Sequence, residues 1–479
     1  MKRRYDLVAI GGGTAGIVAS TVAAGLGARV ALIERDRIGG ECLYTGCVPS
    51  KALIASAARA HALRTAAALG IAPVEPEVDF TAVMARVRSA IERAGVEDTP
   101  EHLRSLGVEV IQSEARFIRP GVVAAGGREL GYRMALIGTG SVTAVPDVPG
   151  LERIDGLTNE TIFGLEQLPT RLTVLGGGPI GCELAQAMAR LGSSVTLVEA
   201  GPRLLPAEEA EASTLIGSVF AEEGIDVRLG VEATAAEVPE GGCGRLLLSS
   251  GDEVDFDRIL LATGRRSVTS SLGLEAVGVE VRPDGSLPVD ERLRTSGDRI
   301  YAAGDVVGEL RFTHVAGHDA LTAVTNGLLR TRRRVDRRAT PWVTFTDPEV
   351  AHVGISEQIA RASGGRVEVV RHDLERLDRA ITSGGVGFTK LTTGRRGRLL
   401  GATIVGPAAG ESILEPARLI ASHGRVDEIA GTIHPYPTYG EGVARAAEDG
   451  VWRRLLTGRT RAALRPLLAL GRAIDRPRG

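Results

Sequence analysis

Short apolar runs that end in glycine-rich turns recur along the chain and dominate its hydrophobic pattern. Two of them are "YDLVAIGGGTAG" (5–16) and "RLTVLGGGPIG" (171–181), where a buried strand leads into a tight turn and a helix begins. Further apolar runs end in turns at "LIGTGS" (136–141), "ILLATGRR" (259–266) and "IYAAGDVV" (300–307). This alternation of strands and helices predicts an α/β fold with two Rossmann-like dinucleotide-binding domains.

The two longest glycine turns form an internal repeat, because each residue of the first copy has a counterpart 165 positions later. The first copy consists of Gly11, Gly13, Gly16 and Glu34, and the second consists of Gly176, Gly178, Gly181 and Glu199. The glycines permit a tight turn and let a pyrophosphate approach the N-terminus of the following helix. The acid ends the next strand, at the spacing that suits a hydrogen bond to the adenosine ribose. Two matched copies therefore predict two dinucleotide sites.

The acid of the second copy also bears on the coenzyme. The carboxylate of Glu199 repels a 2′-phosphate, which favours NADH over NADPH at this site. Arg203, Arg265 and Arg266 lie close enough in sequence to keep NADPH possible. In the last of the apolar runs, Asp305 is placed to bind a sugar-like hydroxyl of a cofactor.

Two of the four cysteines lie close together in "GGECLYTGCVPSK" (39–51), between a strand and the start of a helix. A zinc site needs four ligands, and Cys182 and Cys243 are isolated in the sequence, so we expect no resident metal. A structural disulfide that closes so short a loop removes little chain entropy. A helix N-terminus stabilises a thiolate and lowers the pKa of a cysteine. The pattern therefore favours a redox pair made of Cys42 and Cys47.

Composition and charge narrow the class of protein further. The 479 residues are 43% hydrophobic and 24% charged, which suits a globular protein of about three domains. The formal net charge of −2 gives no pull towards nucleic acid. Four cysteines are too few for a disulfide scaffold, and no apolar run reaches the length of a membrane span. The N-terminal "MKRRYDLVAI" lacks the features of a signal peptide, so we expect a cytoplasmic protein.

Together these motifs and the "FTDPEVAHVG" segment (345–354) closely resemble the flavin-dependent pyridine nucleotide–disulfide oxidoreductases over about residues 5–450. The resemblance implies FAD at the first site and NAD(P)H at the second. It also implies a C-terminal α+β domain, from about residue 340, that forms a homodimer. The residues expected to bind FAD are Gly11, Gly13, Gly16, Glu34, Lys51, Gly140 and Asp305, and those expected to bind NADH are Gly176, Gly178, Gly181, Glu199 and Gly264.

The resemblance also implies roles for the cysteine segment. Cys47 would lie against the flavin and form a charge-transfer complex with it, whereas Cys42 would face the substrate and carry out thiol exchange. Hydride would pass from NADH to the flavin, and two electrons would then pass to the Cys42–Cys47 disulfide. Lys51 lies one helical turn after Cys47 and would contact the flavin and pair with Glu183 of the nucleotide domain.

The chain departs from the family near its C-terminus, in "HPYPTYGEG" (434–442). Disulfide reductases of the family carry there a histidine that acts as acid and base, and a glutamate follows it. Here Tyr436 takes the histidine position and Glu441 the glutamate position, while His434 lies two residues upstream. A tyrosine is a poor general base at neutral pH. Tyr436 and His434 are therefore both catalytic candidates in place of the usual histidine, together with Glu441, and the alternative is that Tyr436 merely packs at the dimer interface.

Tyr436 and "FTDPEVAHVGISE" are similar to mercuric reductase, and soft thiolates suit a mercuric ion. However, no cysteine follows Cys243 in this sequence, so we expect neither the C-terminal cysteine pair nor the N-terminal metal-binding module of mercuric reductases. Three hypotheses remain. They are a mercuric reductase-like enzyme, a dihydrolipoamide dehydrogenase or small-disulfide reductase, and a slow-turnover flavoprotein that senses redox state.

The expected domains are a FAD domain (1–150), an NAD(P)H domain (151–267), a return to the flavin region (268–338) and a dimerisation domain (339–450). A basic linker, "RTRRRVDRR" (330–338), would precede the last of these. The tail (451–479) has eight arginines and one aspartate, and its leucine spacing predicts short amphipathic helices broken near Pro466. Such a tail packs on the enzyme body or attaches to an anionic membrane.

Overall fold

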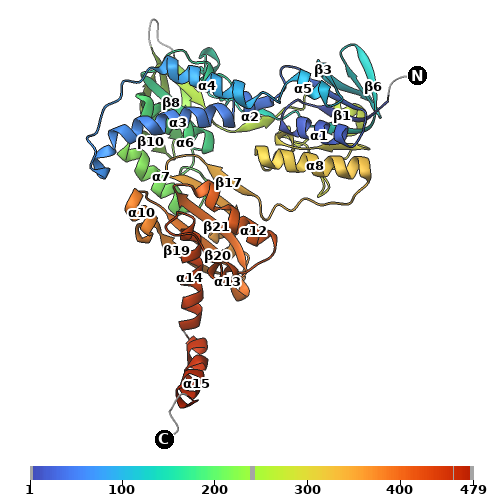
Figure 1. Ribbon diagram of the computed structural model, residues 1–479. Helices are drawn as coiled ribbons and strands as arrows, with labels where there is room; N and C mark the ends of the chain where they lie inside the picture. Colours follow the sequence, from blue (N-terminus) through green and yellow to red (C-terminus); the bar gives the residue numbers. More distant parts are fainter. Residues whose placement is uncertain (1–3, 238–242, 457, 475–479) are drawn as a thin grey trace. The chain divides into compact units, whose positions relative to one another are not determined.

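The sequence is represented by a computed structural model that describes residues 4–237, 243–456 and 458–474. The chain divides into two units. Unit 1 contains Met1–Leu205 and Gly217–Asp336, and unit 2 contains Pro206–Ile216 and Arg337–Gly479. Each unit combines sheets and helices (Figure 1), so the α/β class predicted from the sequence is confirmed.

A seven-stranded sheet carries the first glycine turn in unit 1. Six strands follow the order β3-β2-β1-β6-β5-β4, and β16 also pairs with β6. The strands are β1 (Arg4–Ile10), β2 (Val30–Glu34), β3 (Val108–Gln112), β4 (Ala115–Arg119), β5 (Val122–Ala125), β6 (Arg128–Ile137) and β16 (Ile300–Ala302). The pairings among β1, β2, β3, β6 and β16 are parallel, and β4 and β5 add an antiparallel edge. The carboxyl ends of β1, β6 and β16 therefore meet at one edge, where ligands bind in sheets of this kind.

The residues of these central strands are apolar on both faces, because both faces of the sheet are buried. One face packs against helices α1 (Thr14–Gly25) and α8 (Thr313–Leu329), which lie together beside the sheet (Figure 1). Small residues on these helices, such as Ala19 and Ala320, allow close contact with Leu7, Leu32 and Met134 of the strands. The opposite face buries a second cluster around the edge-to-face pair Phe117 and Tyr132.

A second parallel sheet of unit 1 carries the second glycine turn, with the order β10-β9-β8-β14. Its strands are β8 (Arg171–Leu175), β9 (Ser194–Glu199), β10 (Asp226–Leu229) and β14 (Arg258–Leu261). A three-stranded antiparallel sheet, β11 (Ala233–Glu237), β12 (Gly244–Leu248) and β13 (Glu253–Phe256), adjoins it in sequence. The short antiparallel pair β7 (Ser141–Thr143) and β15 (Arg265–Ser267) joins the segments that follow β6 and β14.

Four helices of unit 1 lie between β2 and β3 in the sequence: α2 (Gly40–Tyr44), α3 (Cys47–Arg64), α4 (Phe80–Ala94) and α5 (Pro100–Ser105). Helix α6 (Pro179–Leu191) follows β8 in the second sheet. Helix α3 packs against both α4 and α6. Helix α3, which begins with Cys47, is therefore held against the helix that follows the second glycine turn.

Unit 2 is built on a five-stranded antiparallel sheet with the order β17-β18-β21-β20-β19. Its strands are β17 (Pro341–Thr344), β18 (Glu349–Gly354), β19 (Glu368–Asp373), β20 (Phe388–Thr393) and β21 (Leu399–Gly406). Its helices are α9 (Glu357–Ala362), α10 (Asp378–Ser383), α11 (Ala409–Ser412), α12 (Leu414–Ala421), α13 (Val426–Ala430), α14 (Glu441–Leu456) and α15 (Gly458–Ile474). The apolar core lies between the sheet and helices α11 to α14.

A buried lysine explains why residues 206–216 belong to unit 2, although helix α7 (Ala210–Glu222) continues into unit 1. The Nζ atom of Lys390 lies 3.2 Å from Glu209, 2.9 Å from Glu211 and 2.6 Å from Glu357. The lysine side chain is only 3% exposed. Because an isolated buried charge is costly, the pairing of Lys390 with Glu209 and Glu211 holds the segment to the sheet of unit 2.

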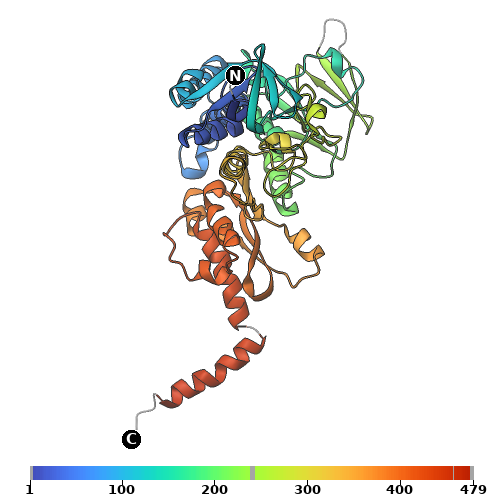
Figure 2. The ribbon, with the colours of Figure 1, turned by 90° about the vertical axis from the view of Figure 1, so that its right-hand side faces the viewer.

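The break predicted near Pro466 is wrong. Helix α14 ends at Leu456, and helix α15 runs from Gly458 to Ile474 with Pro466 inside it. Residue 457 lies outside the described residues. A proline removes one backbone donor, and the carbonyl that loses this partner lies on an exposed helix. The segment therefore stays helical, and it extends away from the sheet of unit 2 in two perpendicular views (Figures 1 and 2).

Candidate active site: two glycine cradles and a cysteine pair

The first glycine turn connects β1 to α1 and leaves no room for side chains. Gly11 has a φ of +102°, and a Cβ atom there would lie 2.3 Å from the carbonyl oxygen of Gly138. A Cβ atom on Gly16 would lie 1.8 Å from the carbonyl oxygen of Gly11. Gly13 is the N-cap of α1 and offers no side-chain cap. The N–H groups of the first helical turn are therefore left for an anionic ligand.

The acid that ends β2 is held at this turn. Glu34 Oε2 accepts a 2.5 Å hydrogen bond from the N–H of Gly12, and Oε1 accepts one of 2.8 Å from Asp36. The carboxylate is thus fixed beside the glycine loop. This is the placement that a ribose hydroxyl requires.

The second glycine turn, between β8 and α6, repeats the same geometry. Gly176 has a φ of +113°, and a Cβ atom there would lie 2.4 Å from the carbonyl oxygen of Ala262. A Cβ atom on Gly181 would lie 1.9 Å from the carbonyl oxygen of Gly176. Glu199 accepts hydrogen bonds of 2.6 Å from the N–H groups of both Gly177 and Gly201. The sequence repeat therefore corresponds to a structural repeat.

The Thr-Gly turns that follow β6 and β14 supply the other wall of each cradle. Gly140 and Gly264 have φ values of +69° and +118°. In each turn the threonine hydroxyl donates to a backbone carbonyl, from Thr139 to Val268 and from Thr263 to Ala144, at 2.7 Å. These hydrogen bonds fix both turns at the carboxyl ends of the central strands.

The two neighbouring cysteines lie at the junction of two helices beside the first cradle. Cys42 is in the short helix α2, and Cys47 is the first residue of α3. Both are free thiols that hydrogen-bond to each other. The Sγ atom of Cys47 also lies 3.6 Å from the Oγ1 atom of Thr313, at the start of α8.

The pair has unequal acidities. The hydrogen bond from Cys42, with those from Thr313 and the charge of Lys51, lowers the pKa of Cys47 to about 6, against the effect of burial. The same hydrogen bond, together with burial, raises the pKa of Cys42. Since the thiolate is the nucleophile, the pair has one reactive thiolate and one thiol that donates to it at neutral pH.

Lys51 lies one turn after Cys47 on α3 and reaches α6. Its Nζ atom is 2.7 Å from Oε2 of Glu183, whose side chain is 8% exposed. The positive charge of Lys51 also favours the Cys47 thiolate. The ion pair therefore links the cysteine helix to the helix of the second cradle, and its role in binding FAD remains a prediction.

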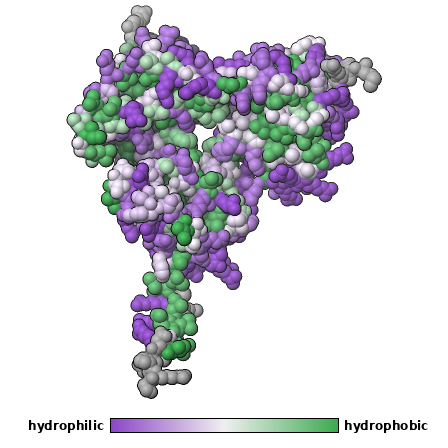
Figure 3. Space-filling model, viewed as in Figure 1, coloured by the Kyte–Doolittle hydropathy of each residue, from purple (hydrophilic) through white to green (hydrophobic). Residues whose placement is uncertain are grey.

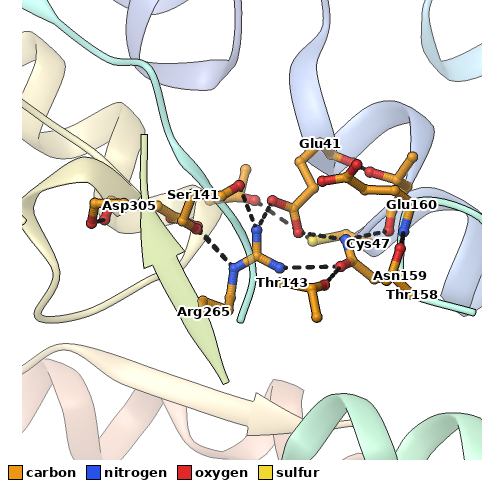
Figure 4. Close-up of polar contacts among 12 residues, drawn as sticks. Glu41, Cys47, Ser141, Thr143, Thr158, Asn159, Glu160, Arg265 and Asp305 are labelled. Atoms are coloured by element: carbon orange, nitrogen blue, oxygen red, sulfur yellow. Dashed lines mark hydrogen bonds and ion pairs between the residues drawn. The ribbon is translucent and has the colours of Figure 1, made fainter. Parts of the chain in front are cut away.

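A buried polar cluster surrounds the residue that precedes Cys42. The guanidinium of Arg265 contacts the carboxylate of Glu41 and donates to Oγ of Ser141 at 2.8 Å (Figure 4). Asn159 donates to Glu41 at 3.0 Å. Burial outweighs the attraction of Arg265 and raises the pKa of Glu41 to about 7. Arg265 follows the second cradle in sequence, but its charge is used at the cysteine segment.

Asp305 belongs to the same cluster. Its Oδ2 atom accepts a 2.7 Å hydrogen bond from Ser141 and lies 3.7 Å from Arg265 (Figure 4). Gly304 before it has a φ of +80°. The glycine cradle, the fixed Glu34 and a carboxylate at the end of β16 together form a donor and acceptor set that fits a flavin dinucleotide.

The C-terminal candidates lie in unit 2, whereas Cys42, Cys47, Lys51 and Glu183 lie in unit 1. Tyr436 is 66% exposed, and its hydroxyl donates to Asp378 at 2.9 Å. This hydrogen bond raises the pKa of Tyr436 above its ordinary value of 10. Even less of the tyrosine is phenolate at neutral pH than the sequence alone suggests, so it is a poor general base there.

The two other candidates in this segment, His434 and Glu441, each lie beside a side chain of opposite charge type. His434 Nε2 lies 2.9 Å from Glu415 Oε2. Burial lowers the pKa of His434, but the hydrogen bonds to Glu415 and to the Thr432 carbonyl, together with the charge of Glu415, outweigh it, so the pKa is raised. Glu441 is buried, and one oxygen lies 2.6 Å from Arg445. Its other oxygen has no hydrogen-bond partner among the described residues.

Sequence reasoning missed several residues of the cysteine neighbourhood. They are Glu41, Ser141, Asn159 and Thr313, together with Arg265, which entered only as a possible contact of NADPH. Glu41 precedes Cys42 directly, and a charged residue inside a glycine-rich cysteine segment was a signal in the sequence. Thr313 gave no such signal, because 266 positions separate it from Cys47.

Two dinucleotide cradles with a cysteine pair beside the first define a flavin- and nicotinamide-dependent oxidoreductase, and comparison with known proteins agrees. The family model described as "pyridine nucleotide-disulphide oxidoreductase" matches residues 5–320, and its dimerisation domain matches residues 340–447. The chain therefore belongs to the pyridine nucleotide–disulphide oxidoreductase family. This family depends on FAD and NAD(P)H, and its dimerisation domain supports a homodimer.

Individual relatives fall into more than one functional group. The chain is 37% identical to a mercuric reductase of Streptomyces lividans over 93% of this chain and 96% of that protein. It is 36% identical to a dihydrolipoyl dehydrogenase of Thermus scotoductus, over 93% and 97%. The crystal structure of LpdA from Mycobacterium tuberculosis superposes with a TM-score of 0.85 at 30% identity, over 93% of this chain and 99% of that one. The protein is thus an FAD-dependent disulfide oxidoreductase.

Proposed function

We propose that this protein uses NADH to reduce a soft metal ion at the Cys42–Cys47 pair, with mercuric ion as the leading acceptor. The observation that carries the proposal is the hydrogen-bonded thiol pair beside the first cradle, in which the pKa of Cys47 is about 6. The mercuric reductases among the relatives support this acceptor, and the dihydrolipoyl dehydrogenases support an alternative.

Each cradle would hold one nucleotide. The first, with Gly11, Gly13, Gly16, Glu34, Gly140 and Asp305, would hold FAD, and the second, with Gly176, Gly178, Gly181, Glu199 and Gly264, would hold NADH. FAD, when bound, would supply the two-electron redox chemistry that connects NADH to the cysteines. The fixed carboxylate of Glu199 favours NADH, because it repels a 2′-phosphate. Arg265 would not neutralise that phosphate, since its guanidinium contacts Glu41 and Ser141.

The thiol pair suits a soft metal ion as substrate. Thiolates are the preferred ligands of such ions, and Cys47 supplies one at neutral pH. When the dithiol closes to a disulfide, it releases two electrons and two protons. Two electrons reduce Hg²⁺ to Hg⁰, so the step balances without a further reactant. No leaving thiolate has to be protonated by the protein in this reaction.

Reduction of a disulfide makes a different demand. Attack of a thiolate on RSSR forms a mixed disulfide and releases RS⁻, which must receive a proton to leave as RSH. Tyr436, with a raised pKa, is a weak partner for this proton exchange. For the reduction of a disulfide, His434 is the favoured proton donor, because Glu415 orients its imidazole and helps to raise its pKa.

The experiment measures NADH and NADPH oxidation by the purified flavoprotein with mercuric ion, lipoamide and glutathione disulfide as acceptors. The proposal expects mercuric ion to give the highest turnover, and Cys42→Ser or Cys47→Ser to lower it at least a thousandfold. A matched control, Cys243→Ser, should leave turnover unchanged because Cys243 lies outside the pair. Higher turnover with lipoamide would favour the alternative, and slow turnover with every acceptor would favour a sensor.

A second variant tests the assignment of the C-terminal segment. Tyr436→His should raise turnover with a disulfide acceptor, because histidine has a pKa near neutrality and Glu441 offers an oxygen without a partner among the described residues. Turnover with mercuric ion should change little. An unchanged rate with disulfides would show that a missing base does not limit this reaction.

A further inference from the structure

Helix α15 lies beyond the part of the chain that the family shares. The dimerisation domain ends at residue 447, whereas α15 spans Gly458–Ile474. Apart from Gly471, every residue of α15 whose burial is described is exposed. The helix extends away from the sheet of unit 2 (Figures 1 and 2). Packing in the core of the enzyme therefore does not explain why the chain forms α15.

One side of α15 is apolar. Four apolar residues lie in one sector of the helix, because they are separated by three, one and six positions: Leu464, Leu467, Leu468 and Ile474. Leu467 and Leu468 are each 63% exposed. Hydrophobic side chains are visible along this segment (Figure 3). Trp452 and Leu456, near the end of α14, are also exposed. Exposed apolar surface of this kind marks an interaction site.

The charge of the same helix is entirely positive. Residues 458–474 contain four arginines, and three of them, Arg461, Arg465 and Arg472, are separated by four and seven residues and so form a single stripe next to the apolar sector. Residues 458–474 contain no aspartate or glutamate. A second copy of α15 packed along this stripe would bring arginines against arginines. An anionic surface with an apolar interior complements both sectors at once.

We propose that α15 binds the surface of an anionic lipid bilayer, with its leucine sector in the acyl region and its arginine stripe at the headgroups. Long arginine side chains suit this border, because the stem stays apolar while the guanidinium reaches the phosphates. None of the described helices is both long and apolar enough to cross a bilayer. The helix would therefore lie in the plane of the interface.

The experiment is co-sedimentation of the full-length flavoprotein with vesicles of phosphatidylcholine alone or with phosphatidylglycerol added. Binding to the anionic vesicles is expected at low salt and should fall at least tenfold in high salt, because salt screens charges at the surface. Leu467→Glu/Leu468→Glu should lower binding at least tenfold. Each Arg→Gln change at 461, 465 or 472 should lower it about fivefold, whereas Arg→Lys should change it less than about twofold.

The matched control is Leu69→Glu/Ile71→Glu, which charges two residues of similar exposure, 67% and 62%, far from α15 in sequence. This control should bind as the unaltered protein does, and NADH oxidation should be the same in all variants. Absence of binding to anionic vesicles would overturn the proposal. Binding that survives Leu467→Glu/Leu468→Glu would overturn it as well. So would the finding that this double variant changes only the oligomeric mass of the protein in analytical ultracentrifugation.

Discussion

The two glycine cradles share one backbone design but differ in what lies next to them. At the first cradle, the segment that carries the cysteines packs against the glycine loop, so that a Cβ atom on Gly40 would lie 2.6 Å from the Cα atom of Gly13. At the second, a Cβ atom on Gly178, the counterpart of Gly13, would have no described atom within 4 Å. Both loops also accept a hydrogen bond from the following segment, from Gly39 to Gly12 and from Leu205 to Gly177. The difference therefore lies at the start of the helix, where backbone covers Gly13 but not Gly178.

This difference suits two ligands that are used in different ways. A covered loop must release its ligand through a movement of the chain, which suits a group that stays bound through many turnovers. An open loop lets a ligand enter and leave within each turnover. The same turn thus serves as a holder for FAD or as a docking site for NADH, depending on the segment beside it.

The clearest way to break the comparison is to add a methyl group to each loop. Gly40 has a φ of +61° as well as the contact with Gly13, so Gly40→Ala is expected to lower the FAD content of the purified protein more than tenfold. The φ of Gly178 is −76°, so Gly178→Ala should retain full FAD content. The ratio of visible to ultraviolet absorbance measures the bound flavin.

Circular dichroism of both variants controls for misfolding. If Gly40→Ala keeps its flavin while folded, the contact between the cysteine segment and the first loop is not needed for retention. Equal loss of flavin from both variants would remove the distinction between a covered and an open loop.

The acids of the two cradles offer a second test. Glu199→Ala should raise the KM for NADH about tenfold and narrow the preference for NADH over NADPH, because a ribose contact and a repulsive charge are both removed. The bound flavin should be unaffected. Steady-state kinetics with each coenzyme measures the change, and Glu34→Ala is the matched variant, expected to weaken FAD instead. A raised KM after Glu34→Ala alone would reverse the assignment of the cradles.

The sequence predicted the repeated part of the molecule well. The glycine spacing and the two acids imply local turns, and local turns follow from the residues that form them. The cysteine segment was also recognisable, because Cys42 and Cys47 lie within one short stretch. These features depend on neighbours in sequence, and the structure has them where the sequence placed them.

Contacts between distant segments could not be read from the same patterns. Arg265 follows the second cradle directly, yet β15 pairs with β7 and directs the arginine to Glu41. Thr313 reaches Cys47 only because α8 begins beside the cysteine helix. The break expected at Pro466 was wrong for another reason, since one missing donor does not end an exposed helix. Long-range pairing and solvent exposure decide these cases.

The contact between Arg265, which follows the second cradle in sequence, and Glu41, which precedes Cys42, can be tested through the titration of Glu41. Its pKa is raised to about 7, so the folded protein holds this proton more tightly than the unfolded chain, whose pKa is near 4.5. The stability that this proton contributes is present below pH 4.5 and is lost as the pH rises towards 7. Relative to Glu41→Gln, the unaltered protein should lose about 1–3 kcal/mol of unfolding free energy over this range, after allowance for partial exposure. Urea unfolding at pH 5 and pH 8 measures it.

A free energy difference between the two proteins that does not change with pH would contradict the prediction for Glu41. Asp36→Asn serves as the control, because Asp36 is exposed and lies in the same region of the sequence. Its free energy of unfolding gives the baseline for the loss of an exposed carboxylate.

The smallest expected effect concerns the thiolate beside the first cradle. Alkylation of Cys47 in the reduced protein should rise with pH to a plateau, with a midpoint near 6. Cys42→Ser should raise this midpoint most, because the hydrogen bond from Cys42 is the largest cause of the shift, and Thr313→Val should raise it by less than about one unit. Mass spectrometry of the Cys47 peptide follows the reaction, and Cys243, whose pKa is raised by Asp257, is the internal reference. Because Cys243 is exposed but lacks the helix junction, equal midpoints for the two cysteines would show that the junction does not make Cys47 acidic.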